Sequence, residues 1–240
     1  MTCPTKFERT RRQAHRGSRP SGVWHHDRMN DGPAPAPPST TEAIYAKEWL
    51  ARFRSRFDEE AGDPRTALGL FYERHRRFVA APGFDSARTP VYTYEEWNRA
   101  FAAFLATLAR DFGLVQAPGW TDVPQLLWFW HGVPDRPAVA IREVKVAGDA
   151  VVRQEVPSVV KSGALLTVLV LYPDAPLLPG ATTVDKATEL WKDRVAEELA
   201  RLAVTQEFLL ATISALDWEV PAPWKGFAWQ PREQVMIPIR

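Results

Sequence analysis

Apolar side chains recur at helical spacing in the part of the chain that follows residue 40. The pattern predicts a first helix over residues 44–58 and a second over 66–79. The apolar face of the first helix consists of Ile44, Trp49, Phe53 and Phe57. A third helix is predicted to begin at Thr93, because Thr93 and Glu96 have the spacing of a capping box. Trp97, on the apolar face of this helix, is interpreted as a core residue.

The second half of the chain carries the shorter apolar runs that are typical of β-strands. Residues 125–130 form an apolar and aromatic run, residues 131–137 hold turn-forming Gly and Pro, and residues 138–146 form a second run. Together these segments predict a β-hairpin.

Helices and strands alternate after the hairpin. A short helix is predicted within 156–162, and the strongly apolar run 165–172 predicts a strand that is buried on both faces. The amphipathic segment 184–205 predicts a long helix, which leads to a fourth strand over 208–214. A helix between two apolar strands favours a parallel crossover. Residues 224–229 are predicted to add an edge strand.

The order of these elements predicts an α/β fold, in which a mixed sheet is flanked by helices. We expect a basic tail and a Pro/Ala linker over residues 1–40, an N-terminal helical region over 41–92 and an α/β core over 93–240. With 240 residues and 45% hydrophobic content, the chain can bury one good-sized core.

The first 28 residues are rich in positive charge and lack apolar periodicity, so we expect them to be disordered. They hold seven of the 30 Lys and Arg residues but only two of the 29 acidic residues. The rest of the chain carries 23 basic against 27 acidic residues, and this charge gives no support to non-specific nucleic-acid binding. The tail is either a nucleic-acid-binding arm or the result of a misassigned start codon, with translation beginning at Met29.

Composition excludes several classes of protein and site. The longest apolar runs are far shorter than the roughly 20 residues that span a bilayer, and the polar N-terminus lacks the pattern of a secretory signal. We therefore expect no membrane partner and a cytoplasmic location. The single cysteine, Cys3, lies in the tail, so neither a disulfide nor a cysteine-based zinc site is expected in the folded part.

Glu143 and Lys145 are two charged residues near the end of the strand predicted over 138–146. Successive side chains on a strand point to opposite faces, so both share a face with the apolar Val139 and Ile141. Burying a charge is costly unless it is paired or bound to a metal ion. The pair is therefore expected to be either a structural salt bridge or half of a cation site.

The order of helix, hairpin, short helix, strand, long helix and strand, with Glu-x-Lys late in the hairpin, resembles the PD-(D/E)xK nuclease superfamily. The resemblance covers residues 93–229, and Glu143-Val-Lys145 corresponds to the Glu-x-Lys part of the family's short motif. It implies a restriction-endonuclease-like core and a hydrolase that cleaves phosphodiester bonds, in DNA more readily than in RNA.

The resemblance also implies a cofactor, Mg²⁺ or Mn²⁺, and roles for the two charged residues. Glu143 would be a metal ligand and Lys145 the catalytic lysine. In such sites the ion lowers the pKa of a bound water and neutralises charge on the phosphate. The lysine orients the water or stabilises the transition state.

The family has an Asp on the first hairpin strand, and two residues are candidates for its place. A hairpin that turns about Pro134 puts Gln125 opposite Glu143. An amide oxygen can coordinate a cation but brings no negative charge, so the metal affinity should fall. A small shift of the turn centre instead brings Asp122 opposite Glu143 or Lys145, and this would restore the carboxylate.

Further charged residues are weighed as additions to the site. Glu155 lies just beyond the hairpin, and Glu95 and Glu96 begin the helix from which many family members supply another carboxylate. The capping box already explains Glu96. Asp135 falls at the hairpin tip and is interpreted as a turn residue. Lys161, which precedes Ser and Gly, is interpreted as a lysine at a helix C-terminus rather than a phosphate ligand.

Three functions are compatible with these residues. The first is a magnesium-dependent nuclease. The second is an inactive protein of the same fold that binds nucleic acid or protein, with Glu143 and Lys145 as an internal salt bridge. The third is an α/β scaffold that binds another protein through exposed tryptophans near Trp218, Trp224 and Trp229. A homodimer or another protein partner is compatible with each, and Asp122 separates the first two.

Overall fold

A computed structural model gives the fold of this chain. It describes residues 43–80, 94–117, 125–131, 133, 135–144, 149–172, 181, 183–213 and 224–240. The expectations for the tail, for Asp122, for Lys145 and for Trp218 lie outside these residues. All the elements below belong to one compact unit, Pro37–Arg240.

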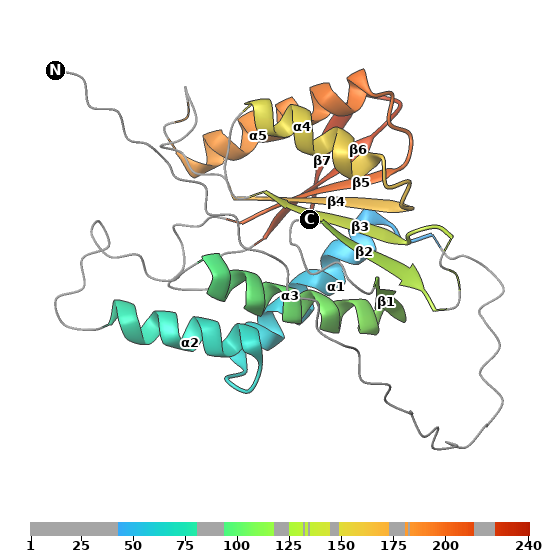
Figure 1. The fold of residues 1–240 in the computed structure, drawn as a ribbon. Helices are drawn as coiled ribbons and strands as arrows, with labels where there is room; N and C mark the ends of the chain where they lie inside the picture. The colour runs from blue at the N-terminus through green and yellow to red at the C-terminus, as the bar shows by residue number, and fades with distance from the viewer. Residues whose placement is uncertain are drawn as a thin grey trace, which may run out of the picture. The chain divides into compact units, whose positions relative to one another are not determined.

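Five helices and seven strands make up the described part of the chain (Figure 1). The helices are α1 Ala46–Gly62, α2 Ala67–Val79, α3 Tyr94–Asp111, α4 Asp149–Val160 and α5 Val184–Arg201. The strands are β1 Leu114–Gln116, β2 Gln125–Trp130, β3 Val139–Val144, β4 Leu166–Leu171, β5 Glu207–Thr212, β6 Lys225–Gln230 and β7 Val235–Ile239.

The strands form one sheet in the order β1-β2-β3-β4-β5-β6-β7. Strands β3, β4 and β5 are parallel to one another, and the remaining pairs are antiparallel. Helices α4 and α5 make the two crossovers between the parallel strands and cover one face of the sheet, while α1, α2 and α3 cover the other (Figure 1). The predicted mixed sheet flanked by helices is confirmed, as are the hairpin and the parallel crossover through α5.

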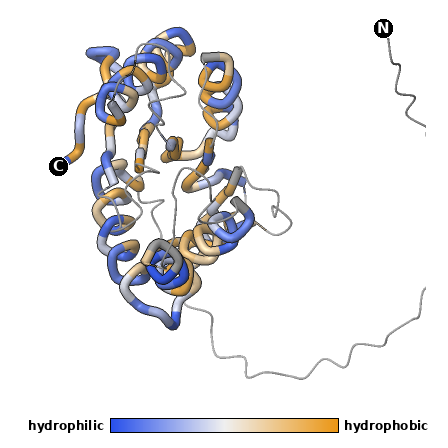
Figure 2. The backbone as a smooth tube through the Cα atoms, turned by 90° about the vertical axis from the view of Figure 1, so that its left-hand side faces the viewer, coloured by the Kyte–Doolittle hydropathy of each residue, from blue (hydrophilic) through white to orange (hydrophobic). Residues whose placement is uncertain are grey.

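Each face of the sheet has its own hydrophobic core. One cluster packs aromatic residues of α1 and α3, including Phe53 and Phe104, against Val139 and Ile141 of β3. The other packs residues of α4 and α5, including Val156 and Trp191, against Ala140 of the same strand. Along the tube in Figure 2, the helices alternate hydrophobic and hydrophilic positions, as the packing of amphipathic helices against a sheet requires.

The structure corrects several predicted elements. Helix α4 begins at Asp149, earlier than expected, and contains Pro157 in its interior. Strand β6 is not an edge strand, because β7 pairs with its outer side. Neither β7 nor the short β1 was predicted from the sequence. β7 contains Pro238, which weakens a strand pattern, and an edge strand tolerates it because one side makes no ladder.

Candidate functional site

Glu143 is a buried carboxylate on the face of β3 that packs against α3. Val139 and Ile141, four and two residues earlier, belong to the core on that face, and Val144 belongs to the core on the other. The side chain of Glu143 shares the first face, since residues two apart on a strand point the same way. The residue is only 8% exposed. The predicted alternation along β3 is therefore confirmed as far as Val144.

Two aromatic side chains donate hydrogen bonds to Glu143. The indole Nε1 of Trp97 in α3 donates to Glu143 Oε1 at 2.9 Å, and the Tyr172 hydroxyl donates to the same oxygen at 2.6 Å. The Trp97 indole also lies 2.8 Å from the Tyr172 hydroxyl and donates to it. We call these three residues the Glu143 cluster. Hydrogen bonds to a charged acceptor are stronger than neutral ones, so the cluster fixes the carboxylate in one orientation.

The Glu143 cluster lies at the carboxyl ends of two parallel strands. Glu143 is the next-to-last residue of β3, and Tyr172 directly follows β4. Trp97 is in the first turn of α3, where the helix dipole favours a negative charge. Open α/β sheets bind their ligands outside the carboxyl ends of the strands. The cluster is therefore placed where such folds have their sites.

Tyr172 has a strongly perturbed acidity. Burial of its hydroxyl, followed by the negative charge of Glu143 and the hydrogen bond to it, raises the pKa of Tyr172 well above its ordinary value of 10.0. The phenol consequently remains protonated at neutral pH and acts as a donor to Glu143.

A small hollow adjoins the Glu143 carboxylate. It is lined by Glu143 and Asn98 and otherwise by apolar side chains of α3, β2 and β3, among them Phe101 and Ile141. The Asn98 Oδ1 atom is buried and accepts no hydrogen bond from the described residues. A surface with so few polar atoms holds a water molecule or an apolar group more readily than a hydrated ion.

The register of the hairpin differs from the expected one. Gln125 pairs with Arg142, and Leu126 pairs with Ile141. Gln125 is thus not opposite Glu143, and the prediction of that pairing was wrong by one residue. A one-residue shift transfers a position to the other face of a sheet, so Gln125 occupies a register position on the Arg142 face.

The other acidic candidates do not join Glu143. Glu155 of α4 forms an ion pair with Arg142, whose side chain lies on the opposite face of β3 from Glu143. Glu96 is exposed and lies 3.7 Å from Arg74 of α2. Glu95, also exposed, pairs with Arg99 one turn along α3. None of these carboxylates is brought to the Glu143 cluster.

The structure places two further residues as predicted, one in a turn and one at the end of a helix. Asp135 is exposed in the turn between β2 and β3. Lys161 is exposed just after α4, and Gly163 two residues later has a φ of 67°, the left-handed conformation that ends many helices.

The expectation of exposed tryptophans was wrong for the two that the structure describes. Trp224 and Trp229 are 3% and 4% exposed. Trp224 packs in the aromatic core against Phe53 and Phe57 of α1, and the Trp229 indole donates to the carbonyl oxygen of Val204. Neither is available to a protein partner.

Sequence reasoning missed two members of the Glu143 cluster. Trp97 was interpreted only as a core residue, and it is one, but its indole also binds Glu143. The sequence contained only a weak indication that Tyr172 has a polar partner. It is a phenol at the end of a strongly apolar strand pattern. The contact between them depends on packing between segments 75 residues apart.

In the part of the chain that the structure describes, no group of three or more His, Cys, Asp or Glu side chains could hold a metal ion. The described residues also contain no helix that is both long and apolar enough to span a bilayer. No protein-family model matches this sequence, and no curated protein has significant similarity to it.

Proposed function

We propose that this chain hydrolyses phosphodiester bonds in nucleic acid, with Glu143 at the centre of its site. The observation that carries the proposal is a nearly buried carboxylate, held by two donors at the carboxyl end of β3. A buried charge in a fixed orientation is costly to maintain, and such groups gather at functional sites.

The order of elements around Glu143 supports the proposal. Apart from the short β1, a helix, a β-hairpin, a helix, a strand, a long helix and a strand follow one another as α3, β2 with β3, α4, β4, α5 and β5. This is the order that the resemblance to PD-(D/E)xK nucleases led us to expect. Glu143 lies on the second strand of the hairpin, the strand on which the resemblance places the Glu-x-Lys motif of that family.

A metal site would need ligands beyond the described residues. Glu143 supplies one carboxylate, whereas Gln125 pairs in register with Arg142, Glu155 forms an ion pair with Arg142 and Glu96 lies near Arg74. The neighbouring hollow is mainly apolar. The described donors therefore do not fit a Mg²⁺ ion by themselves. Asp122 and Lys145 remain the candidates to complete the site.

Cleavage of plasmid and single-stranded DNA tests the proposal. With Mg²⁺ or Mn²⁺ present, we expect Lys145→Ala to lower the rate by about 100-fold or more, the usual effect of losing a group that acts in the transition state. Lys161→Ala is the matched control, because Lys161 is exposed just after α4 and distant in the fold from β3's carboxyl end. Equal rates for the two variants would exclude Lys145 from catalysis.

A second candidate function is a nuclease-fold module that binds nucleic acid without cleaving it. The specific observation in its favour is that both aromatic donors converge on Glu143 Oε1, which gives the carboxylate a structural role of its own. Calorimetric titration with Mn²⁺ separates the candidates. If Glu143 is a ligand, Glu143→Gln abolishes the heat of binding while the exposed control Glu95→Gln retains it. In a metal-free module, neither the native chain nor the variants release heat.

A further inference from the structure

The hollow beside Glu143 has the size of one water molecule. Its volume is about 10 Å³, close to the roughly 10–15 Å³ that a single bound water needs. A hydrated Mg²⁺ ion, which keeps several waters, does not fit this space. Asn98 and Ala102 of α3 line the hollow and are only partly buried, so water has a short path to it from the surface.

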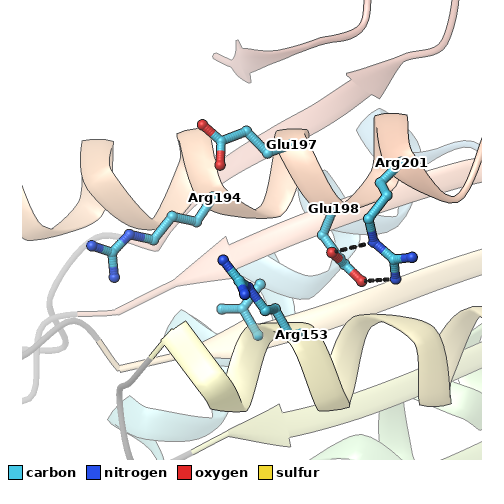
Figure 3. Close-up of a pocket in the computed structure, with 6 residues that line it drawn as sticks. Arg153, Arg194, Glu197, Glu198 and Arg201 are labelled. Atoms are coloured by element: carbon cyan, nitrogen blue, oxygen red, sulfur yellow. Dashed lines mark hydrogen bonds and ion pairs between the residues drawn. The ribbon is translucent and has the colours of Figure 1, made fainter.

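The Asn98 Oδ1 atom is an acceptor that needs a donor. It is buried and accepts no hydrogen bond from the described residues, and an unpaired buried acceptor costs free energy. Glu198, in the larger hollow between α4 and α5, shows the usual arrangement of a buried acceptor. It is 6% exposed and accepts hydrogen bonds from Arg201 (Figure 3). For Asn98, a bound molecule that donates a hydrogen bond would remove the cost.

Glu143 provides a second acceptor in the same hollow. An ionised carboxylate has about four acceptor positions, so Glu143 can accept from a bound molecule in addition to its protein donors. The other described residues that line the hollow are apolar. A water molecule has two O–H groups, and these match two acceptors in a space that is otherwise apolar.

We propose that Asn98 and Glu143 hold one water molecule in this hollow and that this water is the nucleophile of the hydrolysis. The inference rests on the proposed phosphodiesterase function. With both hydrogens directed to acceptors, the water oxygen keeps its lone pairs for the substrate. This oxygen forms a bond to phosphorus, one of its protons passes to the Glu143 carboxylate, and the bond from phosphorus to the leaving oxygen breaks. The leaving oxygen takes up a proton from solvent.

Asn98 is a positioning residue in this reaction, because it orients the water and takes no proton itself. Its position on α3 suits that role. Asn98, Phe101, Ala102 and Leu105 follow one another at the spacing of a single helical face, and all of them line the hollow. The apolar members of this face leave the water few partners other than the two acceptors.

A high-resolution crystal structure of the full chain tests the water site. We expect electron density for a water within hydrogen-bonding distance of both Asn98 Oδ1 and the Glu143 carboxylate. In Asn98→Leu, which removes the acceptor and keeps a similar shape, this density should vanish. A native hollow without such density would overturn the proposal, and so would density that persists in the variant.

Cleavage of single-stranded DNA with Mg²⁺ or Mn²⁺ present tests the role of the water. We expect Asn98→Leu to lower kcat about 10- to 100-fold, the usual effect of a misplaced reacting group, and to leave KM unchanged. Thr107→Val is the matched control, because it also replaces a polar side chain of α3 by an apolar one of similar shape. The Thr107 hydroxyl binds only groups of α3 itself, so the kcat of this variant should equal that of the native chain. Equal kcat values for Asn98→Leu and Thr107→Val would exclude the water as the nucleophile.

The two experiments separate this inference from the proposed function. If the native chain does not cleave DNA, the proposed function fails and the nucleophilic role fails with it, while the crystal structure still decides whether the water is bound. If the native chain cleaves DNA and its hollow holds no water, the proposed function stands and this inference is overturned.

Discussion

At the scale of single residues, the Oε1 atom of Glu143 connects the candidate site to the packing of the fold. One oxygen accepts from an indole and a phenol, and these donors come from α3 and from the end of β4. The same contacts couple the stability of the fold to the candidate site, because removing a donor leaves a buried charge less well satisfied.

Tyr172→Phe removes the shorter of the two hydrogen bonds to Glu143. We expect the free energy of unfolding to fall by about 1.5–3 kcal/mol, the usual contribution of a hydrogen bond to a charged group. Urea unfolding at neutral pH measures the change. Tyr45→Phe is the control, because Tyr45 is 57% exposed. A loss no greater than that of the control would show that the Tyr172 hydroxyl does not stabilise the cluster.

The pKa of Tyr172 gives this effect a pH dependence. Its pKa is raised in the folded chain above the ordinary value of 10.0, so the neutral phenol stabilises the fold below that pH. The contribution is lost as the pH rises through the higher folded value. We therefore expect the stability difference between the native chain and Tyr172→Phe to shrink in unfolding experiments above pH 10.0. A difference that grows with pH would contradict this assignment.

At the scale of elements, the junction between α1 and α2 shows how backbone packing restricts sequence. The Thr66 hydroxyl donates to the carbonyl oxygen of Glu60 and accepts from the backbone N–H of Gly69, so it links the end of α1 to the start of α2. This tight junction leaves no room on Gly69, where a Cβ would lie 1.9 Å from the carbonyl oxygen of Asp63.

Gly69→Ala and Gly62→Ala should change stability in opposite directions. Alanine in a helix is normally favoured over glycine by about 1 kcal/mol. We expect a smaller gain of the same sign for Gly62→Ala, because Gly62 is the last residue of α1 and a Cβ at this position would meet nothing within 4 Å. For Gly69→Ala the backbone contact should cost about 1–3 kcal/mol, as overpacking usually does. Thermal unfolding of both variants measures the difference, and stabilisation by Gly69→Ala would contradict the packing of α2 on α1.

At the scale of the whole molecule, one sheet separates two hydrophobic cores. The Glu143 cluster belongs to the side of α1, α2 and α3, and helices α4 and α5 cover the other side. Within the described part of the chain, both cores consist of residues between Ile44 and Ile239. The positive charge of the N-terminal residues is thus separate in sequence from the residues that build these cores.

A chain that begins at Met29 should be as stable as the native chain. Among the described residues, both cores begin no earlier than Ile44, so we expect the melting temperature to change by less than about 2 °C. Calorimetry of the two chains measures it. Weaker binding of the shorter chain to DNA at low salt would favour the hypothesis of a nucleic-acid-binding arm, because that chain carries 23 basic against 27 acidic residues. A large fall in melting temperature would mean that the removed residues stabilise the folded unit.

The elements of this protein follow from local patterns in its sequence. Helical spacing placed α1, α2, α3 and α5 within a few residues of their ends, and apolar runs placed β2 to β6. Alternation along β3 put Glu143 on a buried face. These features depend on residues a few positions apart. Side chains repeat every 3.6 residues in a helix and every two residues in a strand, so the position of a residue in the sequence determines the face on which it lies. Pro157 and Pro238 obscured α4 and β7, because proline is usually excluded from such elements.

Tertiary structure alone decided which side chains meet. The sequence could not distinguish a hairpin centred on Pro134 from one displaced by half a residue, yet that displacement moved Gln125 from Glu143 to Arg142. Trp97 and Tyr172 reach Glu143 from 46 positions before it and 29 after it. Such contacts depend on how a helix and a strand pack on the sheet, which local periodicity does not encode. The sequence thus determined that Glu143 is buried, and the packing determined which groups hold it.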